Sequence, residues 1–476
     1  MHARLVREVI AAGALVVALS VLWLHDPRFE GDSRALVRGA RHAAGCIDDG
    51  IWTECGEEVV HFPLVQYLLT IPGLAADWSD ERILRSFEVV NVAAMLGAGV
   101  VLVRTGRRLA ARPGAWLMAA VALSSPLLAY GKSTFREPLT ASILVLFAAA
   151  AVARVPRPLV ATLAFAATIN HETLAPFVLG VGLLAARGPD GGRLLPPWRA
   201  TAAITAGIAA GVISNALFNV FRFGTIRNVP LLADEYRVPT NALRAELAAA
   251  LWVSPNGGLL WFWMIPVVLL VVVASRGVAI AVRNPRDVAA WAPRVAPLGL
   301  AIAHSAGLAS WWSPWGWYAW GPRLSLPLVA ALALLALQAD RLWLGRVIGS
   351  LLARPVLLVV TVAVSVVLAL PHLGVAHDEE PYRGAFFTTV TEDCPDPVGT
   401  HIDGTQSEVY YYECQLLRRA WKHRPLVLLD RAGGALSVIT FPVLVLSAAL
   451  LLMVGWTPDL EKAGAYEPQS VTANPA

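Results

Sequence analysis

Long apolar runs recur along this 476-residue chain, and they constrain its fold more than any other feature. Hydrophobic residues make up 57% of the sequence and charged residues only 15%, and the mean hydropathy is +0.59. A soluble protein of this length would carry about 25% charged residues. The sequence therefore predicts an all-α polytopic membrane protein.

The apolar runs predict about twelve transmembrane helices, although several runs are short for a bilayer core of about 30 Å. The first run follows basic residues, as in a signal peptide, but no small-x-small cleavage site closes it, so we interpret it as a retained helix. The predicted spans are 9–24, 88–103, 115–131, 137–153, 157–169, 173–187, 200–218, 257–275, 293–312, 322–339, 355–371 and 434–456.

Arginine clusters alternate with these runs and orient the predicted topology. Each cluster falls on the side shared with the N-terminus, which the positive-inside rule makes cytoplasmic. We therefore expect a multi-pass plasma-membrane protein with both termini in the cytoplasm. The clustered residues are Arg4, Arg7, Arg104, Arg107, Arg108, Arg112, Arg154, Arg157, Arg187, Arg193, Arg199, Arg276, Arg283, Arg286, Arg341, Arg346 and Arg354.

The opposite face receives three long loops, and all four cysteines fall within them. The loops are 25–87, 219–256 and 372–433; Cys46 and Cys55 lie in the first, and Cys394 and Cys414 in the last. Two cysteines in each of two loops favour two local disulfides in an oxidising compartment, and the alternative is four free thiols. The arginines and the cysteines thus place these loops on the same, extracytoplasmic side.

Familiar cofactor motifs are absent from the sequence. It contains no Walker motif, no GxGxxG after a strand, no HExxH and no CxxC. The net charge of +4 is modest and is explained by membrane topology, so we expect no nucleic-acid partner. No cluster of metal ligands is visible, which leaves a divalent metal ion as an open possibility.

The first outer loop contains two candidate interfacial helices. After Asp32, a helix would carry Arg34, Arg38 and Arg41 on one face and small or apolar residues on another, as in a helix lying on a membrane surface. The stretch "HFPLVQYLLTIPGL" is too short to span the bilayer and suits a second such helix. Asp32 is either a helix cap or a functional acid.

Ionisable residues also stand at the outer ends of the predicted spans. They are Lys132 and Glu137 in "LAYGKSTFREPLTAS", His171 in "TINHETLAP", Arg222 in "FNVFRFG" and Arg323 in "WGWYAWGPR". A charged residue at membrane depth is a functional candidate by default, whereas a polar turn or a helix-dipole contact is the structural alternative.

Aromatic residues crowd around Arg323. Trp315, Trp317, Tyr318 and Trp320 precede it, and an aromatic belt at the headgroup level accounts for part of this cluster. A belt does not account for an arginine directly before an apolar helix on the face where positive charge is not expected.

The order of these segments resembles the GT-C superfamily of integral-membrane glycosyltransferases, which includes protein O-mannosyltransferases and bacterial aminoarabinose and arabinofuranosyl transferases. The resemblance covers about residues 10–340 and departs from the family in its first loop, where a familiar acidic pair is only Gly31-Asp32. Asp26, Asp48 and Asp49 are alternative acids. The matching segments are "GDSRALVRGARHAAG", "HFPLVQYLL", "SPLLAYGKSTFREPLTASILVL", "INHETL", "NVFRFG", "SPNGGLLWF" and "WGWYAWGPRLSLPLVAAL".

The resemblance implies a GT-C-like fold and a sugar donor carried on a polyprenyl phosphate. The sugar, a hexose or a pentose, would pass to an extracytoplasmic hydroxyl of a cell-envelope glycan, lipid or protein. Asp32 would act as the general base, and Glu137 would orient the acceptor or help to hold a divalent metal. Arg323, Arg222, Lys132 and His171 would bind the donor phosphate, and Trp315, Trp317, Tyr318 and Trp320 would contact the sugar and the lipid.

The sequence predicts three parts. Residues 1–340 form the catalytic transmembrane module, including loops 25–87 and 219–256. Residues 341–456 form further helices with the disulfide-bridged loop 372–433, and 457–476 form a disordered cytoplasmic tail.

A multi-pass transporter and a lipid-linked glycan polymerase or ligase are the alternative functions. Convergence of the outer acids and arginines on one cavity would favour an enzyme.

Overall fold

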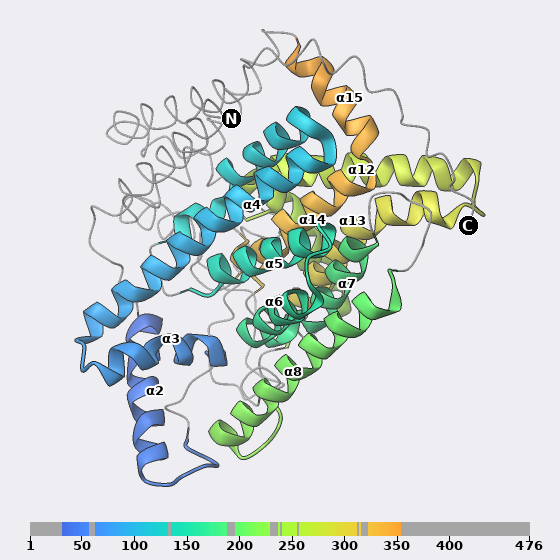
Figure 1. Ribbon diagram of the computed structural model, residues 1–476. Helices are drawn as coiled ribbons and strands as arrows, with labels where there is room; N and C mark the ends of the chain where they lie inside the picture. Colours follow the sequence, from blue (N-terminus) through green and yellow to red (C-terminus); the bar gives the residue numbers. More distant parts are fainter. Residues whose placement is uncertain are drawn as a thin grey trace, which may run out of the picture.

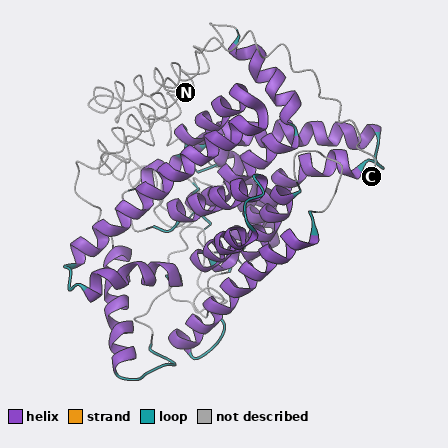
Figure 2. Ribbon diagram, in the orientation of Figure 1, coloured by secondary structure: helices purple, strands orange, loops and turns teal. Residues whose placement is uncertain are grey.

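The computed structural model is helical throughout the residues it describes, apart from one isolated bridge between Arg237 and Trp311 (Figure 2). Some predictions fall outside these residues: the spans 9–24, 355–371 and 434–456, the loop 372–433 with Cys394 and Cys414, and the tail 457–476. The described residues are 31–56, 62–131, 135–187, 196–228, 237–238, 240–254, 257–311, 314–315 and 322–353.

Helices coincide with the predicted spans between residues 88 and 339. Three of the described helices are long and apolar enough to cross a membrane, namely α4, α8 and α12, and a fourth span is possible if α14 and α15, bent by 98°, count as one. The chain is therefore a membrane protein, and the number twelve stays a prediction. The helices are α4 (Asp80–Leu123), α5 (Glu137–Val152), α6 (Arg157–Asn170), α7 (Ala175–Ala186), α8 (Trp198–Phe223), α12 (Met264–Arg283), α13 (Val288–Leu308), α14 (Leu326–Ala339) and α15 (Arg341–Leu352).

Helix α4 contains two of the predicted spans, and the chain turns sharply between them. Ala111 has a left-handed backbone with φ of +50°, and Pro113 follows it. A Cβ atom on Gly106 would lie 2.5 Å from the carbonyl oxygen of Gly114, so only glycine lets the two arms approach this closely. The short arginine-rich link predicted here is helical up to this break, and the helix of the second arm ends at Leu123.

Helix α14 lies at the centre of the bundle, where it contacts α4, α5, α7, α12 and α13 (Figure 1). Every residue from Leu326 to Gln338 is buried. A helix that is apolar on all faces is stable only when protein surrounds it or lipid covers it, and here protein surrounds it. The positions of α5, α7 and α13 around α14 determine which residues meet at each end of the bundle.

The first outer loop folds into α2 (Gly31–Asp48) and α3 (Leu64–Ala75). The predicted two-faced character of α2 is confirmed, because Arg34 and Arg38 are exposed whereas Leu36 and Ala40 are buried. The apolar face packs against α3 and α4, so protein covers it. A membrane-surface position for α2 stays a prediction.

Candidate active site

Glu137 and Arg323, which are far apart in the sequence, meet at one end of the bundle. Glu137 begins α5, and Arg323 begins the 3-10 turn η4 (Arg323–Ser325) that leads into α14. Because α5 and α14 pack together, their starting residues lie side by side. The Nε atom of Arg323 is 3.2 Å from Oε1 of Glu137, and its guanidinium lies 4.0 Å above the ring of Phe135. The structure therefore brings two of the predicted site residues together.

This ion pair is enclosed but incompletely bonded. The side chain of Glu137 is 2% exposed and that of Arg323 is 13% exposed. Neither Nε of Arg323 nor Oε2 of Glu137 makes a hydrogen bond within the part of the chain that the structure describes. The two charges thus attract one another without good hydrogen-bond geometry. Buried polar atoms without partners are uncommon and point to a missing ligand or water.

Arg222 forms a second pair, with Glu172, at the same end of the bundle. Its Nη2 atom lies 3.3 Å from Oε1 of Glu172 and also donates to Asn219, while Nη1 donates to the carbonyl of Phe62 at 2.9 Å. The amide of Asn228 donates to the same Glu172 oxygen at 3.1 Å. Helix α8 continues to Phe223, so Arg222 lies in its last turn rather than in the predicted loop. The charge of Arg222 is therefore balanced within the protein.

His171 and Arg136 lie between these two pairs. His171 occupies the turn between α6 and the 3-10 turn η2 (Glu172–Leu174), is 5% exposed, and has Nδ1 3.0 Å from Oγ1 of Thr173. Burial, and then the charge of Arg136, lower the pKa of His171 well below its usual value, so the ring is neutral at physiological pH. A neutral imidazole can donate a hydrogen bond to a phosphate but adds no positive charge.

The charges around Arg136 link the two ion pairs. Burial lowers the pKa of the Arg136 guanidinium, Glu137 raises it, Arg323 lowers it and Glu172 raises it. Arg136 thus lies within electrostatic reach of both carboxylates and of Arg323. The two ion pairs and Arg136 therefore bring three arginines and two glutamates together at this end of the bundle.

A cavity of about 480 Å³ opens beside these residues. Its wall includes Arg136, Glu172 and Leu324, which are members or immediate neighbours of the two pairs. Arg244 also lines it and donates twice to the carbonyl of Val238, at 2.9 and 2.7 Å, without an ion pair among the described residues. Among the described residues of its wall, three arginines outnumber the one carboxylate, so an anion suits this cavity better than a cation. The third arginine is Arg237, and the imidazoles of His171 and His304 also line it.

Several ionisable residues of this wall were not predicted as site residues from the sequence. His304 sits within the predicted span 293–312 and satisfies the criterion applied to Glu137, that of an ionisable group at membrane depth. Arg237 and Arg244 fall in the predicted loop 219–256; the structure corrects that prediction, because Arg244 belongs to a helix, α10 (Asn241–Val253), which is capped by Thr240 and buries Leu247 and Leu251. Arg136 is adjacent to Glu137, and its position in the structure follows directly from that of its neighbour.

Of the remaining predicted catalytic and substrate-binding residues, Trp315 alone has a described side chain. Trp315 is 1% exposed, and its indole N–H donates to the carbonyl of Gly257 at 2.9 Å, which favours a packing role. The backbone of Asp32 belongs to α2, but its side chain lies outside the described residues. Lys132, Trp317, Tyr318 and Trp320 also lie outside them.

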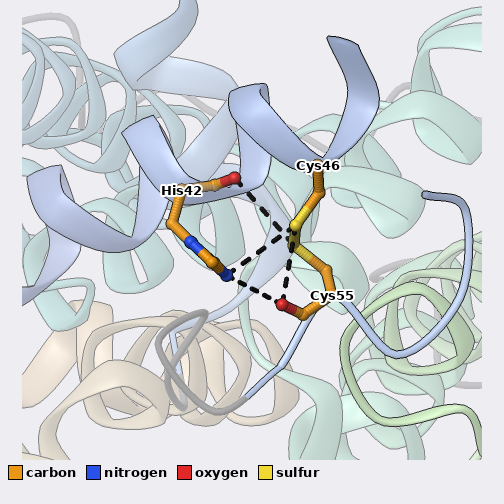
Figure 3. Close-up of side chains that lie close together, drawn as sticks. All are labelled: His42, Cys46 and Cys55. Atoms are coloured by element: carbon orange, nitrogen blue, oxygen red, sulfur yellow. Dashed lines mark hydrogen bonds between the residues drawn. A yellow bond between two sulfur atoms is a disulfide. The ribbon is translucent and has the colours of Figure 1, made fainter. Parts of the chain in front are cut away.

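The Cys46–Cys55 disulfide is confirmed and joins the last turn of α2 to the segment that follows it (Figure 3). The N–H of Cys55 donates to the carbonyl of Phe221 at 2.9 Å, and that of Gly56 to the carbonyl of Arg222 at 3.3 Å. His42 lies beside the disulfide, with Nε2 2.8 Å from the carbonyl oxygen of Cys55. The bridge therefore ties α2 to the turn of α8 that carries Arg222.

The same three side chains are the one His/Cys/Asp/Glu group with metal-ligand spacing in the described part of the chain. Because Cys46 and Cys55 are joined to one another, neither offers a thiolate, and thiolates are the sulfur ligands that metals bind. This group therefore does not form a metal site in its oxidised state. The predicted role of a divalent metal at Glu137 stays a prediction.

The chain resembles one solved structure at low similarity. It is similar to ArnT from Cupriavidus metallidurans, whose crystal structure holds undecaprenyl phosphate, with 16% sequence identity over 94% of this chain and 77% of that chain and a TM-score of 0.44. No family model and no curated protein matches the chain. A similarity at this level by itself establishes neither a family nor an activity.

Proposed function

We propose that this protein is a membrane glycosyltransferase of the GT-C type. It takes a sugar from a polyprenyl-phosphate carrier and transfers it to an acceptor hydroxyl on the extracytoplasmic side. The observation that carries the proposal is the meeting of Glu137 and Arg323 beside a cavity rich in arginine and histidine. Both residues belong to the segments whose order resembles the superfamily.

The proposed reaction is a single displacement at the anomeric carbon. The acceptor hydroxyl gives its proton to the carboxylate of Asp32 as a new carbon–oxygen bond forms. The bond between the anomeric carbon and the phosphate oxygen breaks, and the polyprenyl phosphate leaves with the electron pair. A positioned base contributes about 10²–10⁴-fold to such a step.

The leaving phosphate gains negative charge in this step and needs fixed cations nearby. We assign this role first to Arg323, because its pair with Glu137 leaves Nε without a hydrogen bond and its planar guanidinium matches phosphate oxygens. Arg136 and Arg244 on the cavity wall would add positive charge, and His171 would donate a neutral hydrogen bond. Glu137 would hold Arg323 in place before the donor arrives.

Arg222 receives a different role in this proposal from the one that the resemblance implies. Its guanidinium already bonds to Glu172, Asn219 and the backbone, so phosphate binding would require breaking those contacts. We assign Arg222 to positioning Glu172, which lines the cavity. Trp317, Tyr318 and Trp320 keep their proposed contact with the sugar and the lipid.

A multi-pass transporter is the competing function from another class. Transporters generally bind their solute near the middle of the bilayer, between broken helices. The cavity here adjoins the starts of α5, α7 and α14 and the ends of α6 and α13, so it lies at the ends of helices rather than at their midpoints. A lipid-linked glycan polymerase or ligase remains an alternative with the same carrier, and no described residue favours it over transfer of one sugar.

Purified protein, incubated with a panel of polyprenyl-phosphate sugars and cell-envelope acceptors, tests the proposal. We expect one donor to support transfer, and we expect Asp32→Asn to reduce the rate by about 10²–10⁴-fold. Asp77→Asn, in the same loop and exposed, is the matched control and should keep the wild-type rate. Transport of a lipid-linked sugar into sealed vesicles without transfer would overturn the enzyme assignment.

A further inference from the structure

His304 lines the cavity but has no role in the reaction described above. It lies near the end of α13, is 4% exposed, and packs edge to face against Phe177 with the ring centroids 4.9 Å apart. Both of its ring nitrogens lack a hydrogen bond within the described part of the chain, yet neither is fully enclosed. A buried polar side chain that borders a cavity and has no partner points to a ligand.

His171 lies between His304 and the arginine at the start of α5. After burial, the pKa of His171 is lowered by Arg136 and then by His304, so both residues are within electrostatic reach of its ring. The proposed function places the donor phosphate against Arg323, Arg136 and His171. Because the sugar is joined directly to that phosphate, His304, on the other side of His171, is placed to reach the sugar.

The chemistry of an imidazole suits a hydroxyl group. A histidine ring offers an N–H donor and, when neutral, an acceptor nitrogen, while a hydroxyl group both donates and accepts. Phe177 adds an aromatic ring to the same wall, and small-molecule sites commonly combine such rings with a few polar groups. The volume of about 480 Å³ also falls in the usual range of such sites, about 300–1,000 Å³.

The charges on the wall argue against a sugar that carries an ammonium group. Glu172 is the one carboxylate among the described residues of the wall, and its Oε1 atom already accepts from Arg222 at 3.3 Å and from Asn228 at 3.1 Å. Arg136 and Arg244 line the same cavity. A protonated amino group would meet repulsion from these guanidinium groups, whereas a hydroxyl group would not.

Open space adjoins His304 on the same helix. Gly307 lies one turn further along α13, on the same face as His304, and it also lines the cavity. A Cβ atom added to Gly307 would have no heavy atom within 4 Å. The space beside the imidazole is therefore free for a ligand, and a larger side chain at this position would occupy it.

We infer that His304 determines which sugar the protein accepts, because it forms a hydrogen bond with a hydroxyl group of the transferred sugar. The sugar carries hydroxyl groups rather than a protonated amino group. This inference rests on the proposed function, since it assigns a substrate class to the same cavity. His304 contacts the sugar and not the bonds that form and break, so it acts on specificity rather than as the base.

Matched donors test the class of sugar. The wild type would receive polyprenyl-phosphate mannose, glucose or arabinose in one set of assays, and mannosamine, glucosamine or aminoarabinose on the same carrier in the other. We expect kcat/KM for the best hydroxyl-bearing donor to exceed that for its amino analogue at least tenfold. Preference for an amino sugar would overturn the inference and leave the proposed function intact. Transfer from none of these donors would contradict the proposed function, and the inference with it.

Monodeoxy analogues of the best donor test the role of His304 itself. In the wild type, we expect removal of one particular hydroxyl group to lower kcat/KM at least tenfold. His304→Phe keeps an aromatic ring but cannot form the hydrogen bond, so the penalty for that analogue should fall to about threefold or less. His304→Gln, which keeps a donor and an acceptor, should retain more of it. Unchanged penalties for every analogue in His304→Phe would overturn the inference.

Gly307→Leu tests the position of the sugar without removing a polar group. The leucine side chain would occupy the space beside His304, and KM for the best donor should rise about tenfold. Gly299→Leu is the matched control, because it lies on the same helix with no heavy atom within 4 Å of an added Cβ but does not line the cavity. Wild-type kinetics in Gly307→Leu, or an equal loss in Gly299→Leu, would contradict a sugar site beside His304. Circular dichroism of each variant would establish that its helices are intact.

Discussion

Two arginine–glutamate pairs stand at the same end of this protein, and they differ in how completely they are bonded. Arg222 and Glu172 share hydrogen bonds with two asparagines and a backbone carbonyl, and the guanidinium lies 4.4 and 4.7 Å from the rings of Phe218 and Phe223. The Nε atom of Arg222 lacks a hydrogen bond too, but both of its Nη atoms donate, whereas the described part of the chain shows no hydrogen bond between Arg323 and Glu137, and Nε and Oε2 of that pair are unbonded.

The difference separates a structural pair from one prepared for a ligand. Removing one member of the more completely bonded pair leaves the other charge uncompensated in a largely enclosed site and destabilises the fold. Arg323, which makes no hydrogen bond to Glu137, can instead bind an incoming phosphate without breaking a hydrogen bond, although its attraction to Glu137 becomes weaker. From sequence alone both arginines look alike, since each follows aromatic residues at the end of a predicted span.

Arg222→Ala should give the largest effect on stability. Because Glu172, whose side chain is only 19% exposed, would lose its charged partner, we expect a loss of up to about 3 kcal/mol in the free energy of unfolding. The measurement is the thermal unfolding midpoint in detergent. Arg222→Ala combined with Glu172→Gln should recover part of the loss, whereas an unchanged midpoint in the single variant would mean that the pair is not structural.

Arg323→Ala should instead act on catalysis. We expect kcat/KM for the polyprenyl-phosphate sugar to fall by about 10²–10³-fold, because a donor to the developing phosphate charge is lost. The unfolding midpoint should change less than in Arg222→Ala, because Arg136 remains within electrostatic reach of Glu137 as a second cation. Arg323→Lys should recover only part of the rate, since an ammonium lacks the planar fork. Equal losses of stability in Arg323→Ala and Arg222→Ala would erase the contrast between the two pairs.

Loss of the Cys46–Cys55 disulfide should have an intermediate effect. The bridge ties α2 to the turn of α8 that contains Arg222, and we expect Cys46→Ser to cost about 2–4 kcal/mol. Comparing the unfolding midpoints of wild type and Cys46→Ser, each with and without reductant, measures this. Reductant should lower the midpoint of the wild type to that of the variant. Insensitivity of the wild type to reductant would contradict the proposed tie.

A pH titration should give the smallest effect. Since the pKa of His171 is depressed in the folded state, the unfolded chain binds more protons, and stability should fall as pH drops below about 6.5. For one group the slope is at most about 1.4 kcal/mol per pH unit. The unfolding midpoint from pH 7.5 to 5.5 measures it, and His171→Asn should flatten the profile. A profile unchanged by the substitution would rule out His171 as its source.

The sequence predicts much of the helical framework because hydropathy marks buried or lipid-facing segments directly. Predicted spans between residues 88 and 339 coincide with helices. A link between the spans 88–103 and 115–131 was predicted, but its form was not, because the helix continues to Leu109 and the close approach of Gly106 to Gly114 exists only in the folded chain. Likewise, apolar composition did not distinguish the fully buried α14 from a helix that faces lipid.

The candidate site was predicted only in part, for a related reason. Motif order selected Glu137 and Arg323, and their ion pair agrees with that selection. The pairing of Arg222 with Glu172 could not be read from the sequence, since the two residues come from different helices and neither is marked by spacing. The same holds for Arg244 and His304, which reach the cavity from segments with no charge pattern.

Binding of the carrier alone, polyprenyl phosphate without sugar, tests the central claim most directly. Its dissociation constant would be measured for the wild type, for Arg323→Gln and for the control Arg346→Gln. We predict that Arg323→Gln weakens binding by at least about tenfold, while Arg346→Gln binds as the wild type does. Wild-type affinity in Arg323→Gln would contradict the claim that the Arg323–Glu137 pair receives the donor phosphate.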